Sequence, residues 1–501
     1  MTILNIKPLL TKQSLHMSLL GFSAGLPLLL IFSTLSVWLV KAGVERSTVT
    51  LFSWAGFAYS FKFIWTPLID QYKLPFLSKI GHRKSWLLIS QILIIIFLIF
   101  TSLTDPSKNL YYTAIGIVCI AFASATQDIV IDAYRIESAS IKNQGALSSM
   151  YLAGYRVAMI TSGAGSLWLA SYFGAEQYNV DTWKNVYQIM SCLMLIGVCA
   201  TLFANEPIKK NKDQHSSFQF NFLIALIISV IAFFLSLTYF PTIFVQKSLL
   251  LNTLGSTIQI ILSFGLSILV LNFFTKIKFI SYDKFSIAYI LPIKDFFYRY
   301  KKVAIFILLL IGLYRIADIV MGVMANIFYL EKGYRIEEIA TYSKFFGLFA
   351  TILGGFIGGL YSVHKGVIPS LIVGAIIAAG SNILFAWLAI SETNITFLIA
   401  VITFDNIASG FAGASFIVYL SSLTSIKFTA TQYALFSSIM LFLPKLIAGY
   451  AGSMVDMIGY PFFFILTAIL GVPVIFLIFF IKNISLKKII KNFTSLSLDD
   501  N

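Results

Sequence analysis

Long apolar runs constrain this chain more than any other feature of its sequence. Of its 501 residues, 58% are hydrophobic and 11% are charged, which is far outside the composition of soluble globular proteins. About fourteen runs approach the roughly 20 residues that a helix needs to cross the hydrocarbon core of a bilayer. Because lipid offers no hydrogen-bond partners, such runs must cross it as helices. We therefore predict an all-α, multi-pass membrane protein.

The predicted spans fall into three groups. The first group lies near residues 15–40, 48–68, 86–104, 110–134, 146–172 and 184–204; a pair lies near 219–240 and 249–275; the last group lies near 303–330, 338–361, 366–390, 395–420, 429–453 and 459–481. We divide the chain into an N-terminal six-helix half (1–205), two extra helices with a basic loop (206–301), a C-terminal six-helix half (302–482) and a tail (483–501). The first run has no convincing cleavage site, so we expect it to remain as a helix.

The basic residues predict the orientation of these spans. Lys and Arg are retained on the cytoplasmic side of a membrane, and most of them fall in alternate loops, including the run 209–212 and the segment 276–302. Both termini should therefore be cytoplasmic. Because topology accounts for the formal net charge of +15, we expect no nucleic-acid partner.

The two six-helix groups resemble each other in sequence. The stretch SIKNQGALSSM from Ser140 is echoed by SIKFTATQYALFSSIM from Ser425, and WLVKAG from Trp38 by YLEKG from Tyr329. Two parallel copies of six helices form the arrangement of major facilitator transporters, which bind substrate near the bilayer midplane between the halves. Chance similarity between apolar sequences is the alternative.

Nine ionisable residues interrupt the apolar runs. Each such charge costs roughly 2.5 to 3.5 kcal/mol at the centre of a membrane helix on insertion scales, so anchoring alone would not explain this many. They indicate a polar path through the protein. The nine are Lys62, Asp128, Asp132, Arg156, Arg315, Asp318, Lys344, Asp405 and Lys445.

The embedded carboxylates are candidate proton carriers, because membrane carboxyl groups often serve proton relays. Asp128 and Asp405 are the leading candidates; Asp132 and Asp318 are further candidates that could instead form ion pairs with Arg135 and Arg315. A third interpretation treats Asp128 and Asp132 as the magnesium site of a membrane prenyltransferase. That fold normally has two acidic clusters, and the sequence contains one.

Two Tyr-Arg dipeptides are the best candidates to hold an anionic substrate, because arginine binds carboxylates with two hydrogen bonds. They are Tyr155-Arg156 and Tyr314-Arg315, and pairing of these arginines with nearby aspartates is the structural alternative. Lys445 is the repeat counterpart of Arg156 and should line the same cavity. For Lys62 and Lys344, snorkelling toward the interface is as reasonable as function.

A short basic loop follows the second predicted span. It places Asp70 at a helix end and Arg83 and Lys84 before the next helix, so Asp70 could latch to them and release when the halves rock. The loop resembles the signature loop of the major facilitator superfamily, although its spacing is longer and the second half has no matching Asp.

Several classes of site find no support in the sequence. The three cysteines, Cys119, Cys192 and Cys199, lie in apolar runs, where they resemble buried hydrophobic residues, and the four histidines are scattered. We expect no metal, no cofactor and no enzymatic activity.

Together these segments resemble the AmpG-type muropeptide permeases. The resemblance is carried by GFSAGLPLLL from Gly21, FKFIWTPLIDQY from Phe61, TQDIVIDAY from Thr126, GYRVAMITSG from Gly154, LYRIAD from Leu313 and KFTATQYALFSS from Lys427. It implies proton-driven import of anhydro-muropeptides across a bacterial inner membrane, with protons, lipid and the anionic muropeptide as partners. Sugars and carboxylates of such a substrate suit Arg156 and Arg315 together with Tyr155, Tyr314 and Gln127.

Two positions depart from the pattern expected of that family. Asp405 stands where Glu is expected, and Lys445 where Arg is expected. Each residue has the charge expected at its position but a side chain of different length, so the sequence does not indicate which muropeptide is preferred. The related acetyl-CoA transporters, or a diverged copy with another substrate, are the alternatives.

Overall fold

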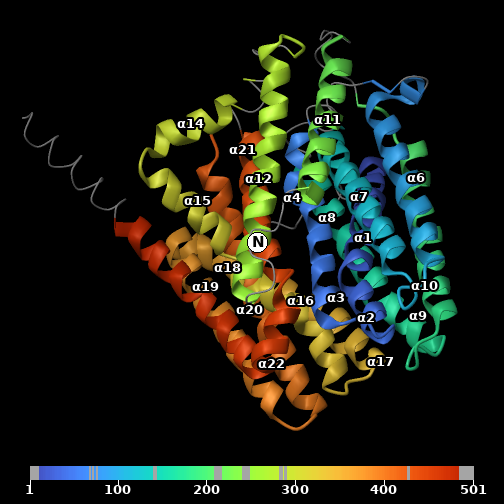
Figure 1. The fold of residues 1–501 in the computed structure, drawn as a ribbon, viewed down its shortest axis with the longest axis vertical. Helices are drawn as coiled ribbons and strands as arrows, with labels where there is room; N and C mark the ends of the chain where they lie inside the picture. The colour runs from blue at the N-terminus through green and yellow to red at the C-terminus, as the bar shows by residue number, and fades with distance from the viewer. Residues whose placement is uncertain are drawn as a thin grey trace, which may run out of the picture. The chain divides into compact units, whose positions relative to one another are not determined.

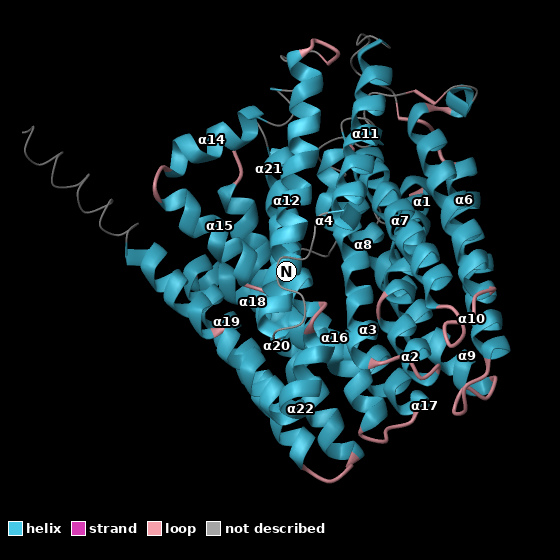
Figure 2. Cartoon of the chain, viewed as in Figure 1, coloured by secondary structure: helices cyan, strands magenta, loops and turns pink. Residues whose placement is uncertain are grey.

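The computed structural model describes residues 11–66, 69, 73–74, 77–138, 144–207, 217–239, 249–280, 286, 290–425 and 429–483. Over these residues the regular structure is helical, with no strand (Figure 2). The all-α prediction is therefore confirmed. Asp70 and both chain termini lie outside the described residues, so the expected latch partner and the cytoplasmic termini stay predictions.

The chain divides into two compact units (Figure 1). The first is Met1–Ser286 with Arg335–Ala340, and the second is Ile287–Tyr334 with Thr341–Asn501. Helices of the first unit are α1 (Lys12–Ile31), α2 (Ser33–Lys41), α3 (Arg46–Leu51), η2 (Phe52–Gly56), α4 (Phe57–Phe61), η3 (Lys62–Ile64), η4 (Leu77–Ile80), α6 (His82–Ser102), α7 (Leu110–Ser138), α8 (Gln144–Ile160), η5 (Thr161–Gly165), α9 (Ser166–Tyr172), α10 (Val180–Phe203), α11 (Ser217–Tyr239), α12 (Leu249–Lys276) and α17 (Ile336–Glu338).

The second unit begins with a short helix and continues with longer ones. Its elements are α14 (Leu291–Tyr300), α15 (Val303–Leu313), α16 (Ile316–Glu331), most of η7 (Ile339–Phe346), α18 (Gly347–Lys365), α19 (Val367–Ile390), α20 (Ile395–Leu423), α21 (Thr429–Ala448) and α22 (Ala451–Leu470). The division of the chain into residues 1–205, 206–301, 302–482 and 483–501 stays a prediction.

Nine helices of the described part are each long and apolar enough to cross a membrane. The predicted second span is instead a succession of short α-helical and 3-10 turns, α3, η2, α4 and η3. Turns of the 3-10 type rise further per residue than α-helical turns and pack less regularly. The structure thus supports a multi-pass membrane protein, and the count of fourteen spans stays a prediction.

Glycines allow the closest helix crossings. In the first unit, a Cβ added to Gly154 on α8 would lie 1.8 Å from the carbonyl oxygen of Ser18, and one on Gly21 of α1 would lie 2.1 Å from a backbone oxygen of α8. In the second unit, a Cβ on Gly354 of α18 would lie 2.1 Å from the carbonyl oxygen of Ile407. The small-residue runs therefore pack helix backbones together, on a different helix pair in each unit.

Matched turns support the predicted repeat. Three glycines in the first half of the chain have positive φ, and three in the second half follow in the same order: Gly43, Gly81 and Gly174, then Gly333, Gly366 and Gly459. Asn109 and Asn394 also correspond, since each side chain accepts a backbone hydrogen bond at a helix start, from Tyr111 at 3.1 Å and from Thr396 at 2.8 Å. Only glycine adopts positive φ without steric cost, so these turns are specified locally.

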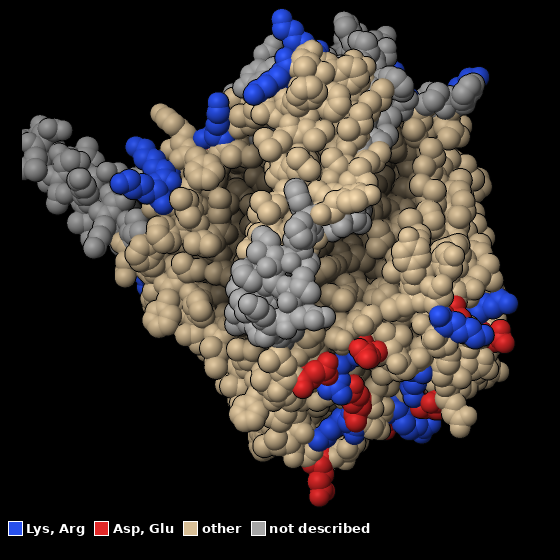
Figure 3. Space-filling model, in the orientation of Figure 1, with Lys and Arg blue, Asp and Glu red and all other residues tan. Residues whose placement is uncertain are grey.

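The two extra helices pack on each other. The Ser267 hydroxyl on α12 donates to the carbonyl oxygen of Ser229 on α11 at 2.7 Å, and apolar side chains such as Ile231 and Leu269 are exposed. Exposed apolar faces suit contact with lipid. On the face drawn in Figure 3, charged side chains lie at helix ends, and the surface along the helices is uncharged.

Candidate functional site

The first unit holds an embedded carboxylate with few partners. Asp128 lies on α7, and its Oδ1 atom is buried without a hydrogen-bond partner in the described part of the chain. Lys62, at the start of η3, attracts it electrostatically, and Asp132 repels it. Sequence reasoning placed Lys62 at the margin, because a residue on another helical segment gives no spacing signal. The fold makes it the cation that acts on Asp128.

Asp132 has a partner of its own. It accepts a hydrogen bond from Nη2 of Arg135 at 3.1 Å, one turn later on α7. Asp132 therefore forms the ion pair that was the alternative to a role as a proton carrier. A proton role for Asp132 would require this ion pair to open.

Arg156 is the embedded arginine of the first unit, and it is partly exposed. Its Nη1 atom donates to the Met159 sulfur at 3.6 Å, and no carboxylate of the described residues lies within ion-pair distance. Its neighbour Tyr155 is also partly exposed, with its ring 5.9 Å from that of Tyr151. Just beyond, α8 passes into the π-helical turn η5, a feature frequent at functional sites.

Gln127 lies among packed helices. Its side chain is fully buried, and Nε2 donates to the Ser23 hydroxyl at 3.0 Å. Gln91 extends the network, because its Nε2 donates to the same Ser23 hydroxyl at 3.5 Å and its Oε1 accepts from Thr201 at 3.0 Å. The network links α1, α6, α7 and α10. In this arrangement, the contacts that Gln127 makes are to neighbouring helices.

In the second unit, the Tyr-Arg dipeptide occupies the break between α15 and α16, within one predicted span. Nε of Arg315 donates to Oδ2 of Asp318 at 2.8 Å, and Nη2 contacts the same oxygen. Ser409 on α20 donates to that carboxylate at 3.3 Å. Interrupted membrane helices are common at transporter binding sites. Here the ion pair with Asp318, in the first turn of α16, fixes the position of the Arg315 side chain.

Asp405 lies near this pair on α20. Its Oδ1 accepts from the Ser381 hydroxyl at 2.9 Å, and both Arg315 and Asp318 act on it electrostatically. Tyr314 is buried and stacked on Phe416, with ring centroids 4.4 Å apart. Its hydroxyl donates to the carbonyl oxygen of Leu371 at 3.1 Å. Tyr314 is thus engaged in packing, in contrast to the partly exposed Tyr155.

The embedded lysines of the second unit differ in surroundings. Lys344 lies in the π-helical segment η7 and donates to Oδ1 of Asn326 at 2.6 Å. Lys445 follows the helix-interior Pro444 on α21 and is partly exposed. Lys344 is therefore held by a buried amide on α16, a contact that sequence reasoning missed.

Arg83 and Lys84 begin α6, as expected, and the structure shows their partners. Arg83 forms two hydrogen bonds to Glu137 at the end of α7, Nη2–Oε1 at 2.6 Å and Nε–Oε2 at 3.0 Å. Glu206, which follows α10, accepts from the backbone N–H groups of Arg83 at 2.7 Å and Lys84 at 3.1 Å. A carboxylate at a helix N-terminus is stabilised by the helix dipole. Sequence reasoning missed both glutamates, whose only signal was acidic charge beside basic loops.

No metal centre is evident in the described ranges, where no group of three or more His, Cys, Asp or Glu residues could hold an ion.

Comparison with known proteins identifies the family. The profile of the Major Facilitator Superfamily matches residues 14–293. "Putative transporter AmpG 4" of Rickettsia conorii is 32% identical over 465 residues, which cover 93% of this chain and 95% of that protein. The chain belongs to the AmpG-type branch of the major facilitator superfamily. The "Anhydromuropeptide permease" of Escherichia coli (strain K12) is 29% identical, covering 92% of this transporter and 78% of the permease.

Solved structures agree on the fold. A POT family transporter in complex with a thioalcohol-conjugated peptide covers 94% of the transporter and 96% of its own chain, with TM-score 0.66 and 15% identity. A D-xylose-proton symporter covers 93% and 95%, with TM-score 0.60 and 12% identity. The resemblance to AmpG-type permeases is confirmed. Relatives and fold are those of transporters and not of an enzyme, so the prenyltransferase interpretation is set aside.

Proposed function

We propose that this transporter imports anhydro-muropeptides across a bacterial inner membrane by alternating access, driven by protons. The observation that carries the substrate assignment is the similarity to the anhydromuropeptide permease, which extends over 92% of the chain. The expected orientation, with both termini in the cytoplasm, belongs to this proposal.

Arg156 is the first anchor for a substrate carboxylate. The residue is partly exposed and its guanidinium has no acidic partner among the described residues, so it can bind an anion without breaking an ion pair. Tyr155, the preceding residue, would assist it, and Lys445 of the second unit is a further candidate for contact with the substrate. Arg315 would bind only by exchanging Asp318 for the substrate, and Gln127 would act by positioning α7. Charge-assisted pairs of this kind contribute about 1.5 to 3 kcal/mol each.

Asp128 is the first candidate for the coupled proton. Its Oδ1 has no hydrogen-bond partner among the described residues, so a proton can bind there without displacing another group. Lys62 would stabilise the carboxylate after release. Asp405, held by Ser381 and close to Arg315, would be the second carrier, with Asp318 coupled to it through that arginine.

Transport by purified protein in liposomes tests both parts. Given an inward acid gradient, vesicles should accumulate labelled disaccharide-peptide and not acetyl-CoA. Selectivity for acetyl-CoA would establish the alternative substrate. Uptake of the muropeptide that ignores the gradient would overturn the proton coupling and leave the substrate assignment standing.

A further inference from the structure

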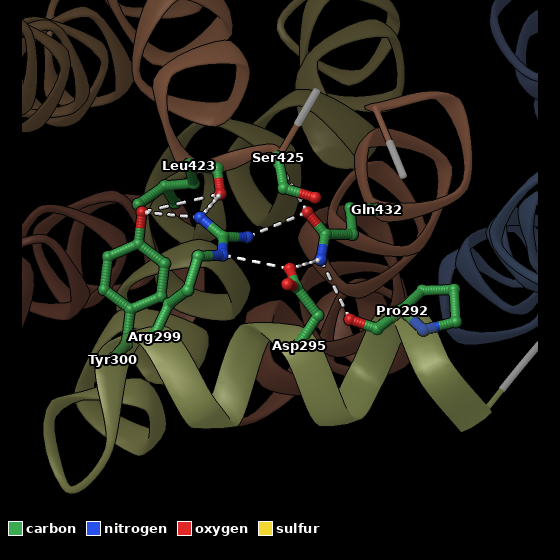
Figure 4. Close-up of polar contacts among 7 residues, drawn as sticks. All are labelled: Pro292, Asp295, Arg299, Tyr300, Leu423, Ser425 and Gln432. Carbon is green, nitrogen blue, oxygen red and sulfur yellow. Dashed lines mark hydrogen bonds and ion pairs between the residues drawn. The ribbon is translucent and has the colours of Figure 1, made fainter. Parts of the chain in front are cut away.

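The helix α14 is fixed to its own unit by one face (Figure 4). Gln432 at the start of α21 donates through Nε2 to Asp295 at 2.9 Å and to the carbonyl oxygen of Pro292 at 2.9 Å, and it accepts from Arg299 at 2.9 Å. Arg299 also donates to the carbonyl oxygen of Leu423, at the end of α20, at 3.0 Å. These bonds tie α14 to the end of α20 and to the start of α21.

Apolar packing strengthens the same face. Phe296 is 2% exposed, and its ring centroid lies 5.0 Å from that of Phe436 and 4.9 Å from that of Tyr300. The inner face of α14 is therefore occupied by its contacts with the second unit.

The opposite face carries exposed apolar side chains. Ile293 and Phe297 are each 40% exposed, and Tyr298 is 82% exposed. Lys294 is exposed beside them, and the exposed Lys301 and Lys302 follow the helix. In Figure 3 the region of α14 shows basic side chains and no acidic one. This mixture of apolar and basic groups is typical of helices that lie in a membrane interface.

The place of α14 in the chain supports such a location. Lys302 directly precedes Val303, where the span Val303–Glu331 begins. A helix of 10 residues extends about 15 Å, so its outer face stays close to the membrane boundary. Anionic headgroups attract basic residues there, by about a factor of five per Lys.

We propose that the outer face of α14 binds anionic phospholipid, with Lys294, Lys301 and Lys302 on the phosphates and Ile293, Phe297 and Tyr298 among the upper acyl chains. Because the inner face bonds to Gln432, bound lipid also steadies the start of α21. The proposal is independent of the transported substrate.

A nitroxide spin label at position 297 tests whether the outer face of α14 lies in the membrane. The label is attached to the whole chain freed of other cysteines, and the protein is reconstituted in nanodiscs of phosphatidylcholine with phosphatidylglycerol. Its collisions with oxygen should outweigh those with an aqueous nickel chelate, as for a label at the exposed Ile305 of α15. Accessibility like that of a label at the exposed loop residue Ser107 would overturn the proposal.

Thermal stabilisation by added lipid tests the charge. In detergent, phosphatidylglycerol should stabilise the protein more than phosphatidylcholine does. The triple variant Lys294→Gln, Lys301→Gln and Lys302→Gln should bind phosphatidylglycerol with an apparent affinity about tenfold weaker or more. The matched control replaces Lys276, Lys278 and Lys482, which are also exposed, and should change it little. If the two triple variants weaken the affinity for phosphatidylglycerol equally, the proposed site is wrong. If inorganic phosphate stabilises the protein as much as phosphatidylglycerol does, lipid is not the occupant of the site.

Discussion

Arg83 on α6 and Glu137 at the end of α7 form a two-point ion pair, with Nη2–Oε1 at 2.6 Å and Nε–Oε2 at 3.0 Å. The arginine side chain is 5% exposed and the glutamate side chain 32%. A guanidinium buried to this degree depends on its partner, since an unpaired buried charge is costly.

Glu137→Gln should therefore destabilise the protein by about 1 to 2 kcal/mol. This is below the roughly 3 to 5 kcal/mol typical of a fully buried pair, because water screens this glutamate. Thermal unfolding in detergent measures the effect. Arg83→Lys should also destabilise, because lysine keeps the charge but loses the two-point geometry. Lys79→Gln, at an exposed position, serves as the control; unfolding of Glu137→Gln at the same temperature as the control would contradict the pair's importance.

Arg156→Ala should raise the KM for muropeptide about 10- to 100-fold, because a charge-assisted pair to a substrate carboxylate is lost. Initial rates of uptake into liposomes measure this change. Arg156→Lys should recover part of the affinity, because the charge remains. An unchanged KM in the alanine variant would remove Arg156 from the substrate site.

Asp128→Asn should abolish the response of uptake to an acid gradient while allowing exchange of labelled for unlabelled substrate. The amide cannot carry a proton, and exchange needs no net proton movement. Asp132→Asn is the informative comparison, since Asp132 is paired with Arg135 at 3.1 Å and we expect gradient-driven uptake to persist. Gradient-driven uptake by Asp128→Asn would exclude this residue as the proton carrier.

Gly154→Ala should destabilise the first unit by several kcal/mol, because its Cβ would lie 1.8 Å from the backbone oxygen of Ser18 and force α1 away from α8. Overpacking typically costs about 1 to 3 kcal/mol and more against rigid backbone. Gly265→Ala on α12, where a Cβ meets nothing within 4 Å, should be neutral or stabilising. Comparing the two melting temperatures checks the prediction, and equal values would refute it.

The contact between Asp105 and Tyr178, in two loops outside the spans, predicts that the stability of the protein depends on pH. The Tyr178 hydroxyl donates to Asp105 at 2.6 Å. Burial acts to raise the pKa of Asp105, but hydrogen bonds from Ser107 and Tyr178 hold it below its usual value. Burial and the bond to Asp105 raise the pKa of Tyr178 to about 12.

The carboxylate's contribution is therefore present above its ordinary pKa of about 3.9 and is lost as the pH falls through its lower folded value. The phenol's contribution is present below about 10 and is lost as the pH rises through about 12. Asp105→Asn should lower the melting temperature at pH 7, and this difference should shrink at pH 3. A difference that stays constant between these pH values would rule out the ionised contact.

Apolar runs in the sequence were enough to predict the class of the protein and its helical content, and the echoed segments predict an internal repeat. These follow from local properties: apolar runs require helices in lipid, and turns such as those at Gly81 and Gly366, with φ of 124° and 89°, need a residue without a Cβ. Spacing along one helix also indicated, as alternatives to roles in transport, the two pairs that formed within a turn, Asp132 with Arg135 and Arg315 with Asp318.

The partners that charged residues have on other helices follow from the packing of the fold. Lys62 acts on Asp128, Lys344 binds Asn326, and Arg83 binds Glu137, yet no spacing in the sequence links the members of these pairs. Likewise, Gln127 resembled a substrate residue in sequence and is bonded to Ser23. Helix crossings bring distant residues together, and the orientation of each helix about its axis depends on the packing of all its neighbours.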